Sequence, residues 1–197
     1  MSTKLLLHVC CGPCAAWPLD FLKADGKFDA TGFFYNPNIH PADEFEKRLD
    51  GARRIFKNAD LPLVVSHDYM QTEWEAFEAA NASAGDGRCA NVPGAGESGD
   101  SPRCEMCYRL RLSRAAQYAC DGGFGAFTTT LLISPYQNHD LIASICKEQA
   151  AACGVGFYYM DFRPHFRDGQ KMARDAGVYR QKYCGCIFSK KTGPPGK

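Results

Sequence analysis

The sequence predicts an α/β protein built around a mostly parallel sheet of about five strands, with helices on both faces. Short apolar or aromatic runs alternate with longer helical patterns along the chain, and this alternation is typical of parallel strands. The 197 residues are 45% apolar and 23% charged, which is an ordinary globular composition and enough chain to bury a core. We therefore expect a single domain over residues 1–189.

The first part of the chain alternates three strands with helices. The apolar run 4–9 predicts a buried strand that ends at cysteines. The aromatic run 31–35 predicts a second strand, and a third short strand is expected at 63–66. Helices are expected between them, over 15–23 and over the charged, periodic segment 42–57.

A glycine-rich segment interrupts this pattern in the middle of the chain. After a helix over 69–80, residues 81–103 contain five glycines and two prolines and predict an exposed loop insertion. A helix over 104–120 and a β-branched, aromatic strand over 124–132 are expected to follow.

The last part of the chain predicts a helix over 139–153, a strand over 156–160 and a short helix over 170–177. Residues 190–197 are expected to form a disordered tail. Ligands of parallel sheets bind beyond the carboxyl ends of the strands. The cysteines that follow the first strand are therefore expected at the ligand-binding edge.

Charge and hydropathy argue against several classes of protein. The formal net charge is +1, far from the strongly basic balance of a general nucleic-acid binder. The N-terminal apolar run is too short for a signal peptide, and no run approaches the roughly 20 residues of a membrane helix, so we expect a soluble, cytoplasmic protein. The segment after the first strand also lacks a glycine-rich nucleotide fingerprint, which argues against a nucleotide-driven enzyme.

Eleven cysteines are the main anomaly of the composition. A disulfide framework is typical of small secreted chains, so clustered cysteines here indicate metal ligands or catalytic thiols. Three clusters stand at predicted element boundaries. Their seven cysteines are Cys10, Cys11, Cys14, Cys104, Cys107, Cys184 and Cys186.

The spacing within these clusters suggests two metal centres. Cys104 and Cys107 share one helix face near a helix N-terminus, where free amides and the helix dipole stabilise thiolates. Neighbouring side chains on an extended strand point to opposite faces, so Cys10 and Cys11 are expected to serve different centres. A cubane cluster takes four cysteines, and the other three can hold a single ion with one open position. A purely structural metal site is the alternative.

The other four cysteines carry no such pattern. Cys120, Cys146 and Cys153 lie on or near predicted helices and are expected to be small buried hydrophobic residues. Cys89 lies in the predicted insertion and is expected to be a bystander thiol.

Ordered blocks surround the cysteine clusters and cover most of the chain. They are LHVCCGPCA at the start, FFYNPNIHP at 33–41, EFEKRL at 44–49, RCEMCYRLRL at 103–112, TTTLLISPYQNH at 128–139, DFR at 161–163 and VYRQKYCGCIFS at 178–189. Together these blocks resemble the epoxyqueuosine reductases of the QueH type.

The resemblance implies a Rossmann-like fold of the adenine-nucleotide alpha-hydrolase (HUP) type, with a small cysteine-bearing helical or loop appendage. It implies a [4Fe–4S] cluster beside a single metal ion, expected to be iron, and no cobalamin. It implies reduction of epoxyqueuosine to queuosine at the wobble position of tRNAs with a G-U-N anticodon. An external one-electron donor of the ferredoxin or flavodoxin type would supply the electrons.

Within this scheme each centre receives its own cysteines. Assigned to the cluster are Cys11, Cys104, Cys107 and one of Cys184 and Cys186. Assigned to the single ion are Cys10, Cys14 and the other thiol of the C-G-C motif. Some members of the family carry Asp where this sequence has Cys14, which leaves the exact role of Cys14 open.

Further residues near predicted element ends are candidates for chemistry and binding. His139 and Asp161 are candidate proton donors, whereas His8 is expected to be a satisfied core residue. The substrate-binding candidates are Tyr35, Asn36, Tyr136, Arg163, Tyr179 and Arg180. The candidates for phosphate contacts are Arg48, Arg109, Arg111, Arg163, Arg180 and Lys182.

Three other functions fit parts of the pattern. An ATP-dependent tRNA thiolase or ligase on the same fold would need a phosphate loop such as S-G-G-x-D-S, where this chain has CCGPC. A thiol–disulfide oxidoreductase would not need the vicinal or C-G-C cysteines. A zinc-stabilised, non-catalytic RNA- or protein-interaction module predicts a colourless protein with one four-thiolate site.

Overall fold

The computed structural model describes residues 2–68, 70–81 and 102–186. It confirms the predicted α/β class, because five strands pair in parallel in the order β3-β2-β1-β4-β5. The strands are β1 (Thr3–His8), β2 (Phe28–Phe34), β3 (Leu63–Val65), β4 (Ala126–Thr129) and β5 (Gly156–Phe157).

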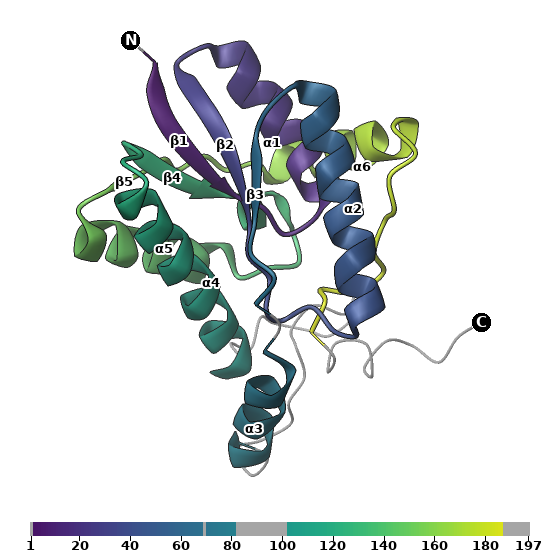
Figure 1. The fold of residues 1–197 in the computed structure, drawn as a ribbon, viewed down its shortest axis with the longest axis vertical. Helices are drawn as coiled ribbons and strands as arrows, with labels where there is room; N and C mark the ends of the chain where they lie inside the picture. Colours follow the sequence, from purple (N-terminus) through teal and green to yellow (C-terminus); the bar gives the residue numbers. More distant parts are fainter. Residues whose placement is uncertain (1, 69, 82–101, 187–197) are drawn as a thin grey trace.

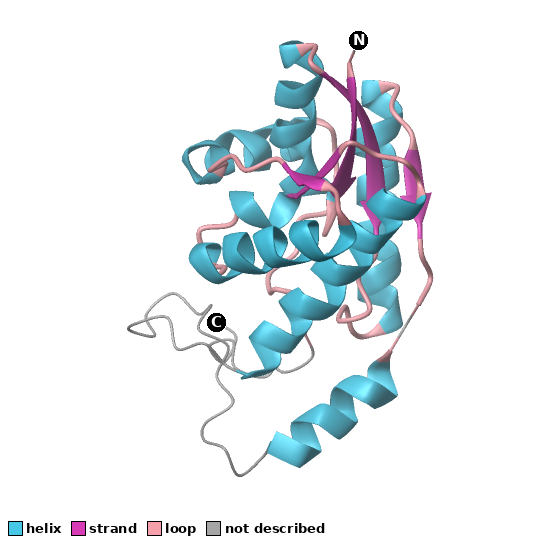
Figure 2. Cartoon of the chain, turned by 90° about the vertical axis from the view of Figure 1, so that its left-hand side faces the viewer, coloured by secondary structure: helices cyan, strands magenta, loops and turns pink. Residues whose placement is uncertain are grey.

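Helices cover both faces of this sheet, as predicted (Figure 1). Helices α1 (Gly12–Asp25), α2 (Ala42–Ala59) and α6 (Phe166–Asp175) lie on one face. Helices α4 (Pro102–Asp121) and α5 (His139–Cys153) lie on the other. Helix α3 (Gln71–Asn81) projects from the body beyond the carboxyl ends of the strands, as Figure 2 also shows. Among the described residues, no helix combines the length and apolar character needed to cross a membrane.

The alternation of side chains along β1 divides the apolar core into two layers. Leu5 and Leu7 are fully buried in the cluster that contains side chains of α1 and α2. Leu6 is fully buried in the cluster on the other face, with side chains of α4 and α5. Burying one such side chain contributes about 1.5–3 kcal/mol, so a central strand that is apolar on both faces anchors both helical layers.

Several predicted boundaries were wrong, among them the ends of two strands and the start of a helix. The strand expected over 124–132 ends at Thr129, and a 3-10 turn over Thr130–Ile133 follows, because the Thr129 hydroxyl accepts the N–H of Leu131 at 3.1 Å. The strand expected over 156–160 is only Gly156–Phe157, which pairs with the first two residues of β4. Helix α6 begins before the predicted 170–177, after a second 3-10 turn.

Only the two ends of the predicted insertion 81–103 fall within the described residues. Asn81 is the last residue of α3, and Pro102 and Arg103 already belong to α4. The remainder of the predicted insertion, including Cys89, lies outside the described residues, and so does the predicted tail 190–197. The single-domain expectation for residues 1–189 therefore stays a prediction.

The strand order defines where a ligand site can form. Strand β1 pairs with β2 on one side and with β4 on the other, so the chain leaves β1 in one direction and later returns on its opposite side. In open parallel sheets a crevice forms at such a switch point, outside the carboxyl ends of the strands. Here that point follows His8 of β1 and Thr129 of β4.

Candidate functional site

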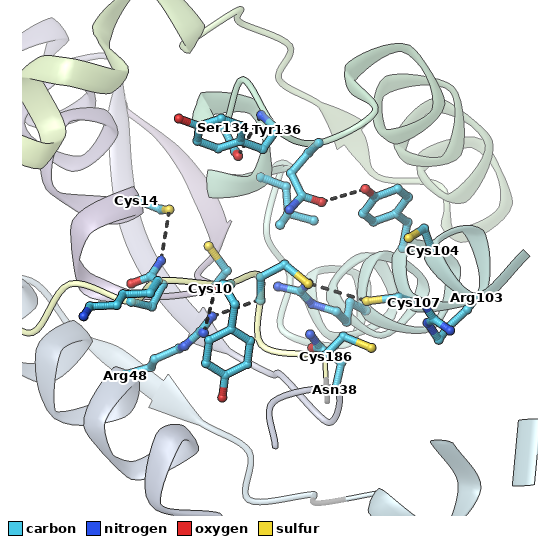
Figure 3. A pocket seen from close by; sticks show the side chains of 18 of the residues that line it. Cys10, Cys14, Asn38, Arg48, Arg103, Cys104, Cys107, Ser134, Tyr136 and Cys186 are labelled. Carbon is cyan, nitrogen blue, oxygen red and sulfur yellow. Dashed lines mark hydrogen bonds between the residues drawn. The ribbon is translucent and has the colours of Figure 1, made fainter. Parts of the chain in front are cut away.

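A cavity of about 380 Å³ lies at this switch point, within the range of roughly 300–1,000 Å³ that is typical of small-molecule sites. The segments after β1 and β4, the N-terminal parts of α1 and α4, and the loop after α6 contribute to its wall. Six of the seven predicted ligand cysteines line it, namely Cys10, Cys14, Cys104, Cys107, Cys184 and Cys186. Figure 3 shows Cys10 and Cys14 on one side and Cys104 and Cys107 on the other. The seventh, Cys11, is fully buried beside Cys10.

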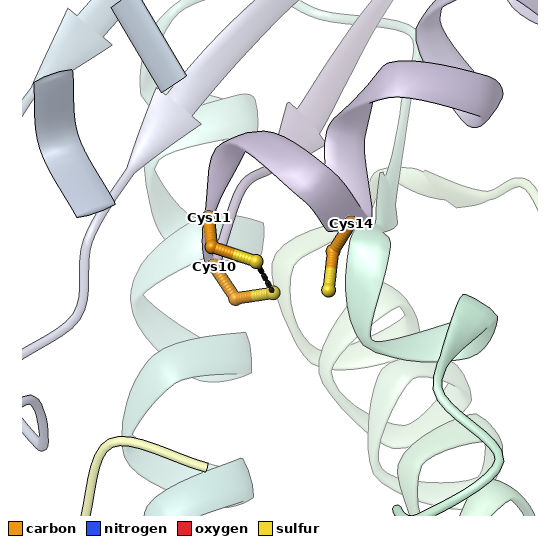
Figure 4. Close-up of side chains that lie close together, drawn as sticks. All are labelled: Cys10, Cys11 and Cys14. Atoms are coloured by element: carbon orange, nitrogen blue, oxygen red, sulfur yellow. Dashed lines mark hydrogen bonds between the residues drawn. The ribbon is translucent and has the colours of Figure 1, made fainter. Parts of the chain in front are cut away.

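The first thiol group consists of Cys10, Cys11 and Cys14, whose sulfur atoms all lie within 4.8 Å of one another (Figure 4). The expectation that Cys10 and Cys11 point to opposite faces was wrong. Strand β1 already ends at His8, and Cys11 is the N-cap of α1, so the chain turns between them and their sulfurs lie 3.7 Å apart.

This separation suits two ligands of one ion. Sulfur atoms at about 2.3 Å from a tetrahedral ion are roughly 3.8 Å apart. Sulfur is a soft donor, so three thiolates favour iron or zinc over hard ions such as Mg²⁺. Cys10, Cys11 and Cys14 therefore fit a single metal ion with one position left open.

The three thiols of the first group shift one another's pKa in opposite directions. Hydrogen bonds from the thiols of Cys11 and Cys14 hold the pKa of Cys10 well below its ordinary value, and the charge of Arg111 and the hydroxyl of Thr130 add to this effect. Burial raises the pKa of Cys11 to about 12, and hydrogen bonding with Cys10 and Cys11 raises the pKa of Cys14. Metal binding would release the protons of those two thiols.

The second thiol group comes from α4 and the loop after α6. Cys107 and Cys186 are buried against Trp74 of α3, with Cys184 half-buried beside them. Cys104, near the N-terminus of α4, packs instead on the cluster that contains Cys11 and Cys14. The cavity therefore lies between the two groups, and Trp74 docks the projecting helix α3 on the second one.

A buried ion pair on α2 holds the C-G-C loop in place. The Arg48 side chain donates from Nε to Glu44 at 2.7 Å, from Nη1 to the carbonyl of Cys184 at 2.9 Å and from Nη2 to the carbonyl of Tyr183 at 3.0 Å. Tyr183 in turn donates its hydroxyl to the carbonyl of His40 at 2.7 Å. Because Arg48 is only 3% exposed, the pair acts inside the protein as an anchor for the last two cysteines.

Glycine is required between those two cysteines. Gly185 has a φ of 111°, in the region that favours glycine. A Cβ atom there would lie 3.0 Å from Nη1 of Arg48 and 3.0 Å from Cγ1 of Ile39. The C-G-C spacing is therefore a steric consequence of packing the loop against α2.

Two glutamines that line the cavity, Gln137 and Gln181, belong to no motif that predicts a functional role. Gln181 donates from Nε2 to the sulfur of Cys11 at 2.8 Å. Gln137 accepts a hydrogen bond from the Tyr108 hydroxyl at 2.6 Å, which orients its amide at the cavity wall. The anchoring pair Glu44–Arg48 could have been found from the sequence, because side chains at i and i+4 of a helix are neighbours.

The predicted phosphate contacts separate into three groups. Arg48 and Arg111 line the cavity but are only 3% and 4% exposed, which leaves little of either side chain for a phosphate, and their phosphate role stays a prediction. Arg109 is exposed but pairs with Glu105 and Glu148, and it does not line the cavity. Arg180 and Lys182 also line the cavity.

The two candidate proton donors do not line the cavity. His139 is buried at the start of α5, with Nε2 at 3.1 Å from the Tyr159 hydroxyl, and burial lowers its pKa. Asp161 accepts from Nε and Nη2 of Arg163 at 2.9 and 2.7 Å, and these bonds lower its pKa to about 2. The catalytic roles of His139 and Asp161 and the substrate role of Arg163 stay predictions.

Of the other substrate-binding candidates, two line the cavity and three lie outside its lining. Tyr136, which is 48% exposed, and Arg180 line the cavity. Tyr35 and Asn36 are buried outside its lining, and Asn36 donates from Nδ2 to the carbonyl of Val9 at 2.8 Å. Tyr179 donates its hydroxyl to Glu44 at 2.8 Å and thus supports the loop anchor.

His8 is confirmed as a satisfied core residue. Its Nδ1 lies 2.8 Å from the Thr129 hydroxyl, and its Nε2 donates to the carbonyl of Tyr35 at 3.2 Å. Burial, followed by the charge of Arg111, lowers the pKa of His8 to about 3, so the ring stays neutral.

The cysteines outside the clusters match their predictions only in part. Cys146 is fully buried, as predicted. Cys120 is exposed and Cys153 is half-buried, so the prediction that both are buried was wrong. Ala119 and Ala150 are buried in the same helical turns, so these turns still contact the core and the two cysteines lie on other sides of their helices.

Solved structures share this fold at low sequence identity. A predicted subunit of tRNA methyltransferase from Methanocaldococcus jannaschii superposes with a TM-score of 0.53 at 10% identity, over 87% of this chain and 74% of that chain. The zinc-inhibited form of teicoplanin deacetylase Orf2 gives a TM-score of 0.50 at 10% identity, over 88% and 83%. These likenesses concern the fold alone, and they agree with the expected α/β layering.

Sequence relatives are much closer. The family described as "Epoxyqueuosine reductase QueH" matches residues 5–192. A protein of that name from Dehalococcoides mccartyi is 35% identical over 96% of this chain and 93% of its own length. Another from Thermotoga maritima is 35% identical over 94% of this chain and 89% of its own length. With its cysteine clusters gathered around one cavity on the expected fold, the chain belongs to the epoxyqueuosine reductase QueH family.

Proposed function

We propose that this protein reduces epoxyqueuosine to queuosine at the wobble position of tRNAs with a G-U-N anticodon. The reaction removes the epoxide oxygen as water and leaves an alkene, so it consumes two electrons and two protons. The observation that carries the proposal is the convergence of six thiols on one cavity, with a seventh behind it, in a member of this family. The proposed reaction would be the last step of queuosine formation.

The proposed cofactors are a [4Fe–4S] cluster and a single metal ion, with iron as the expected ion and no cobalamin. The donor set fits both, because the thiols of the first group are close enough for one ion and the second group offers further cysteines at the same cavity. When bound, the two centres would supply single electrons and a Lewis-acid position for an oxygen of the substrate.

The division of the thiols between the centres is part of the proposal. Cys104 and Cys107 are assigned to the cluster, and Cys10 and Cys14 to the ion. Cys11 was assigned to the cluster from the sequence, yet its sulfur lies 3.7 Å from that of Cys10, which favours the ion. A Cys11→Ser variant separates the two assignments, because it would lose either cluster iron and sulfide or only the additional metal.

Side chains around the cavity are suited to a base that has left the anticodon stack. A wobble base must be unstacked to reach an enclosed site, and aromatic rings commonly receive such bases. The exposed ring of Tyr136 and the amide of Gln137, oriented by Tyr108, lie on the same wall. We propose that Tyr136 stacks on the substrate and that Gln137 forms a hydrogen bond to it.

The approach of the tRNA and of the electron donor is also part of the proposal. Arg180 and Lys182 line the cavity and are proposed to contact the phosphates next to the wobble nucleotide. A ferredoxin or flavodoxin would deliver the electrons one at a time. A cytoplasmic location is proposed because the thiol ligands must stay reduced.

The first test is anaerobic purification followed by iron, sulfide and zinc analysis and an absorbance spectrum. A brown protein with about four cluster irons plus additional metal is expected. That protein should then convert epoxyqueuosine tRNA to queuosine tRNA with a chemical reductant. A colourless protein with one zinc and no sulfide, even after reconstitution, would overturn the proposal in favour of a zinc-stabilised interaction module.

A further inference from the structure

Arg111 contacts one residue of the second thiol group and one residue beside the first. It lies on α4 one turn after Cys107 and is only 4% exposed. Its Nη1 lies 3.8 Å from the sulfur of Cys107, within hydrogen-bonding distance for sulfur, and its Nη2 donates to Oδ1 of Asn36 at 2.7 Å. Asn36 is itself held by the carbonyl of Val9, just before the first thiol group. The guanidinium is therefore fixed in position from both sides of the cavity.

The charge of Arg111 has no carboxylate partner in the described part of the chain. Its contacts there are the sulfur of Cys107 and the amide of Asn36. Arg48 is equally buried, at 3% exposed, yet it has Glu44 at 2.7 Å. Of these two buried arginines, Arg48 is therefore paired with an acid, whereas Arg111 is directed toward sulfur.

A buried guanidinium needs a compensating negative charge. Arginine does not lose its proton in proteins, and an unpaired charge in the interior is costly. The group in contact with Arg111 that can become anionic is the thiol of Cys107, and Arg111 lines the same cavity as Cys10 and Cys104. Sulfur ligands that carry negative charge when a metal is bound would supply the missing counter-charge.

We propose that Arg111 is a positioning residue that raises the reduction potential of the cluster through the sulfur of Cys107. This inference rests on the proposed function, which places Cys107 among the cluster ligands. Adding an electron makes a cluster more negative, so a fixed positive charge and a hydrogen bond to a ligand sulfur both stabilise the reduced state. Arg111 thereby makes the cluster easier for an external donor to reduce.

The experiment compares redox titrations of three variants with the wild-type protein, after iron and sulfide have been counted in each. Arg111→Gln removes the charge, Arg111→Lys keeps it, and Arg109→Gln removes an exposed charge from the same helix as the matched control. Absorbance and electron paramagnetic resonance report the reduced and oxidised cluster. The measured quantity is the midpoint potential of the cluster in each variant.

At the wild-type midpoint, Arg111→Gln should lower the ratio of reduced to oxidised cluster about tenfold or more, which is a shift of about 59 mV to a more negative potential for a one-electron couple. Arg111→Lys should stay closer to wild type than Arg111→Gln, and Arg109→Gln should match wild type. A cluster-loaded Arg111→Gln with an unchanged midpoint would overturn the inference while leaving the proposed function intact. A wild-type protein without any cluster would instead overturn the proposed function.

A second variant keeps the test decisive if Arg111→Gln does not fold or load its cluster. Asn36→Asp places a carboxylate where Nη2 of Arg111 now donates to an amide oxygen at 2.7 Å, so it neutralises the charge and keeps the guanidinium. The midpoint should again become more negative. No shift in a loaded Asn36→Asp protein would contradict a role for the charge of Arg111.

Discussion

The two thiol groups that face the cavity are built in different ways. The first group, Cys10, Cys11 and Cys14, comes from five consecutive positions at the junction of β1 and α1. The second group joins the start of α4 to a loop near the end of the described chain. Local geometry alone brings the first group together, whereas the second exists only because distant segments are held against one another.

The supports of the two groups differ accordingly. Around the first group, the Thr130 hydroxyl contacts the sulfur of Cys10, and the Gln181 amide contacts the sulfurs of Cys11 and Cys14. The second group depends on the buried Glu44–Arg48 pair and on the burial of Trp74. The difference teaches that damage to the tertiary anchor should disable one centre selectively, whereas the other centre should respond mainly to changes in its own ligands.

The largest effect is expected from removing a ligand of the second group. Cys104→Ala should lose the cluster and all measurable reductase activity together, because a cubane with a missing thiolate is poorly held. Iron and sulfide counts with a tRNA assay measure both. The exposed Cys120→Ala serves as control and should keep its cluster. Full cluster absorbance in Cys104→Ala would remove Cys104 from the ligand set.

The next largest effect should come from breaking the anchor of the second group. Glu44→Gln leaves the charge of Arg48 buried without its acid and should lower the free energy of unfolding by about 3–5 kcal/mol. Urea unfolding gives that value, and metal analysis should show loss of cluster iron with retention of the additional metal. Asp50→Asn, which removes an exposed pair with Arg54, should cost at most about 1 kcal/mol. Equal costs in the two variants would contradict an anchoring role for Glu44.

A change in the first group should have the opposite pattern. Cys14→Ala should keep most of the cluster and lower the affinity for the additional metal by at least about tenfold, with impaired turnover. Cys14→Asp should restore part of both, since a carboxylate can also bind a metal. Metal titration and turnover on epoxyqueuosine tRNA provide the measurements. Unchanged turnover in Cys14→Ala would remove this thiol from the site.

A smaller effect is expected from the glycine of the C-G-C loop. Gly185→Ala combines an unfavourable φ of 111° with close contacts to Arg48 and Ile39, and it should lower the free energy of unfolding by about 1–3 kcal/mol. Gly26→Ala is the matched control, because its φ is 66° but nothing lies within 4 Å of the added Cβ. Denaturation midpoints should fall further for Gly185→Ala. The reverse order would show that contacts with α2 do not restrict this loop.

The smallest effect should come from the Asp161–Arg163 pair, which belongs to neither thiol group. The pKa of Asp161 is about 2 in the folded protein, below the value of about 3.9 for an unperturbed aspartate. A depressed folded pKa means that the stabilisation is present above about pH 4 and is lost as the pH falls toward 2. Asp161→Asn should therefore flatten the pH dependence of the free energy of unfolding between about pH 4 and pH 2. The slope of that dependence near pH 7 to 8 should not change. A loss of more than about tenfold in turnover would support the predicted catalytic role for Asp161.

Several parts of the fold and the site followed from local patterns. Hydrophobic periodicity predicted the strand at the N-terminus and the helix over 139–153, because both depend on the spacing of apolar residues over short distances. The end of β4 was not predictable in this way, since the run over 124–132 has no break in composition. There a single side-chain contact, the Thr129 hydroxyl with the N–H of Leu131, ends the strand.

By itself, the sequence determined the parallel α/β class, the presence of cysteine clusters at element boundaries, and the family. Only the tertiary structure decided which of these boundaries meet. It brought the sulfurs of Cys10 and Cys11 to within 3.7 Å of each other. It also buried Arg48 and Arg111, and it left His139 and Asp161 outside the cavity lining. The physical reason is that periodicity and spacing report the face of one element, whereas a site depends on which faces of distant elements pack together.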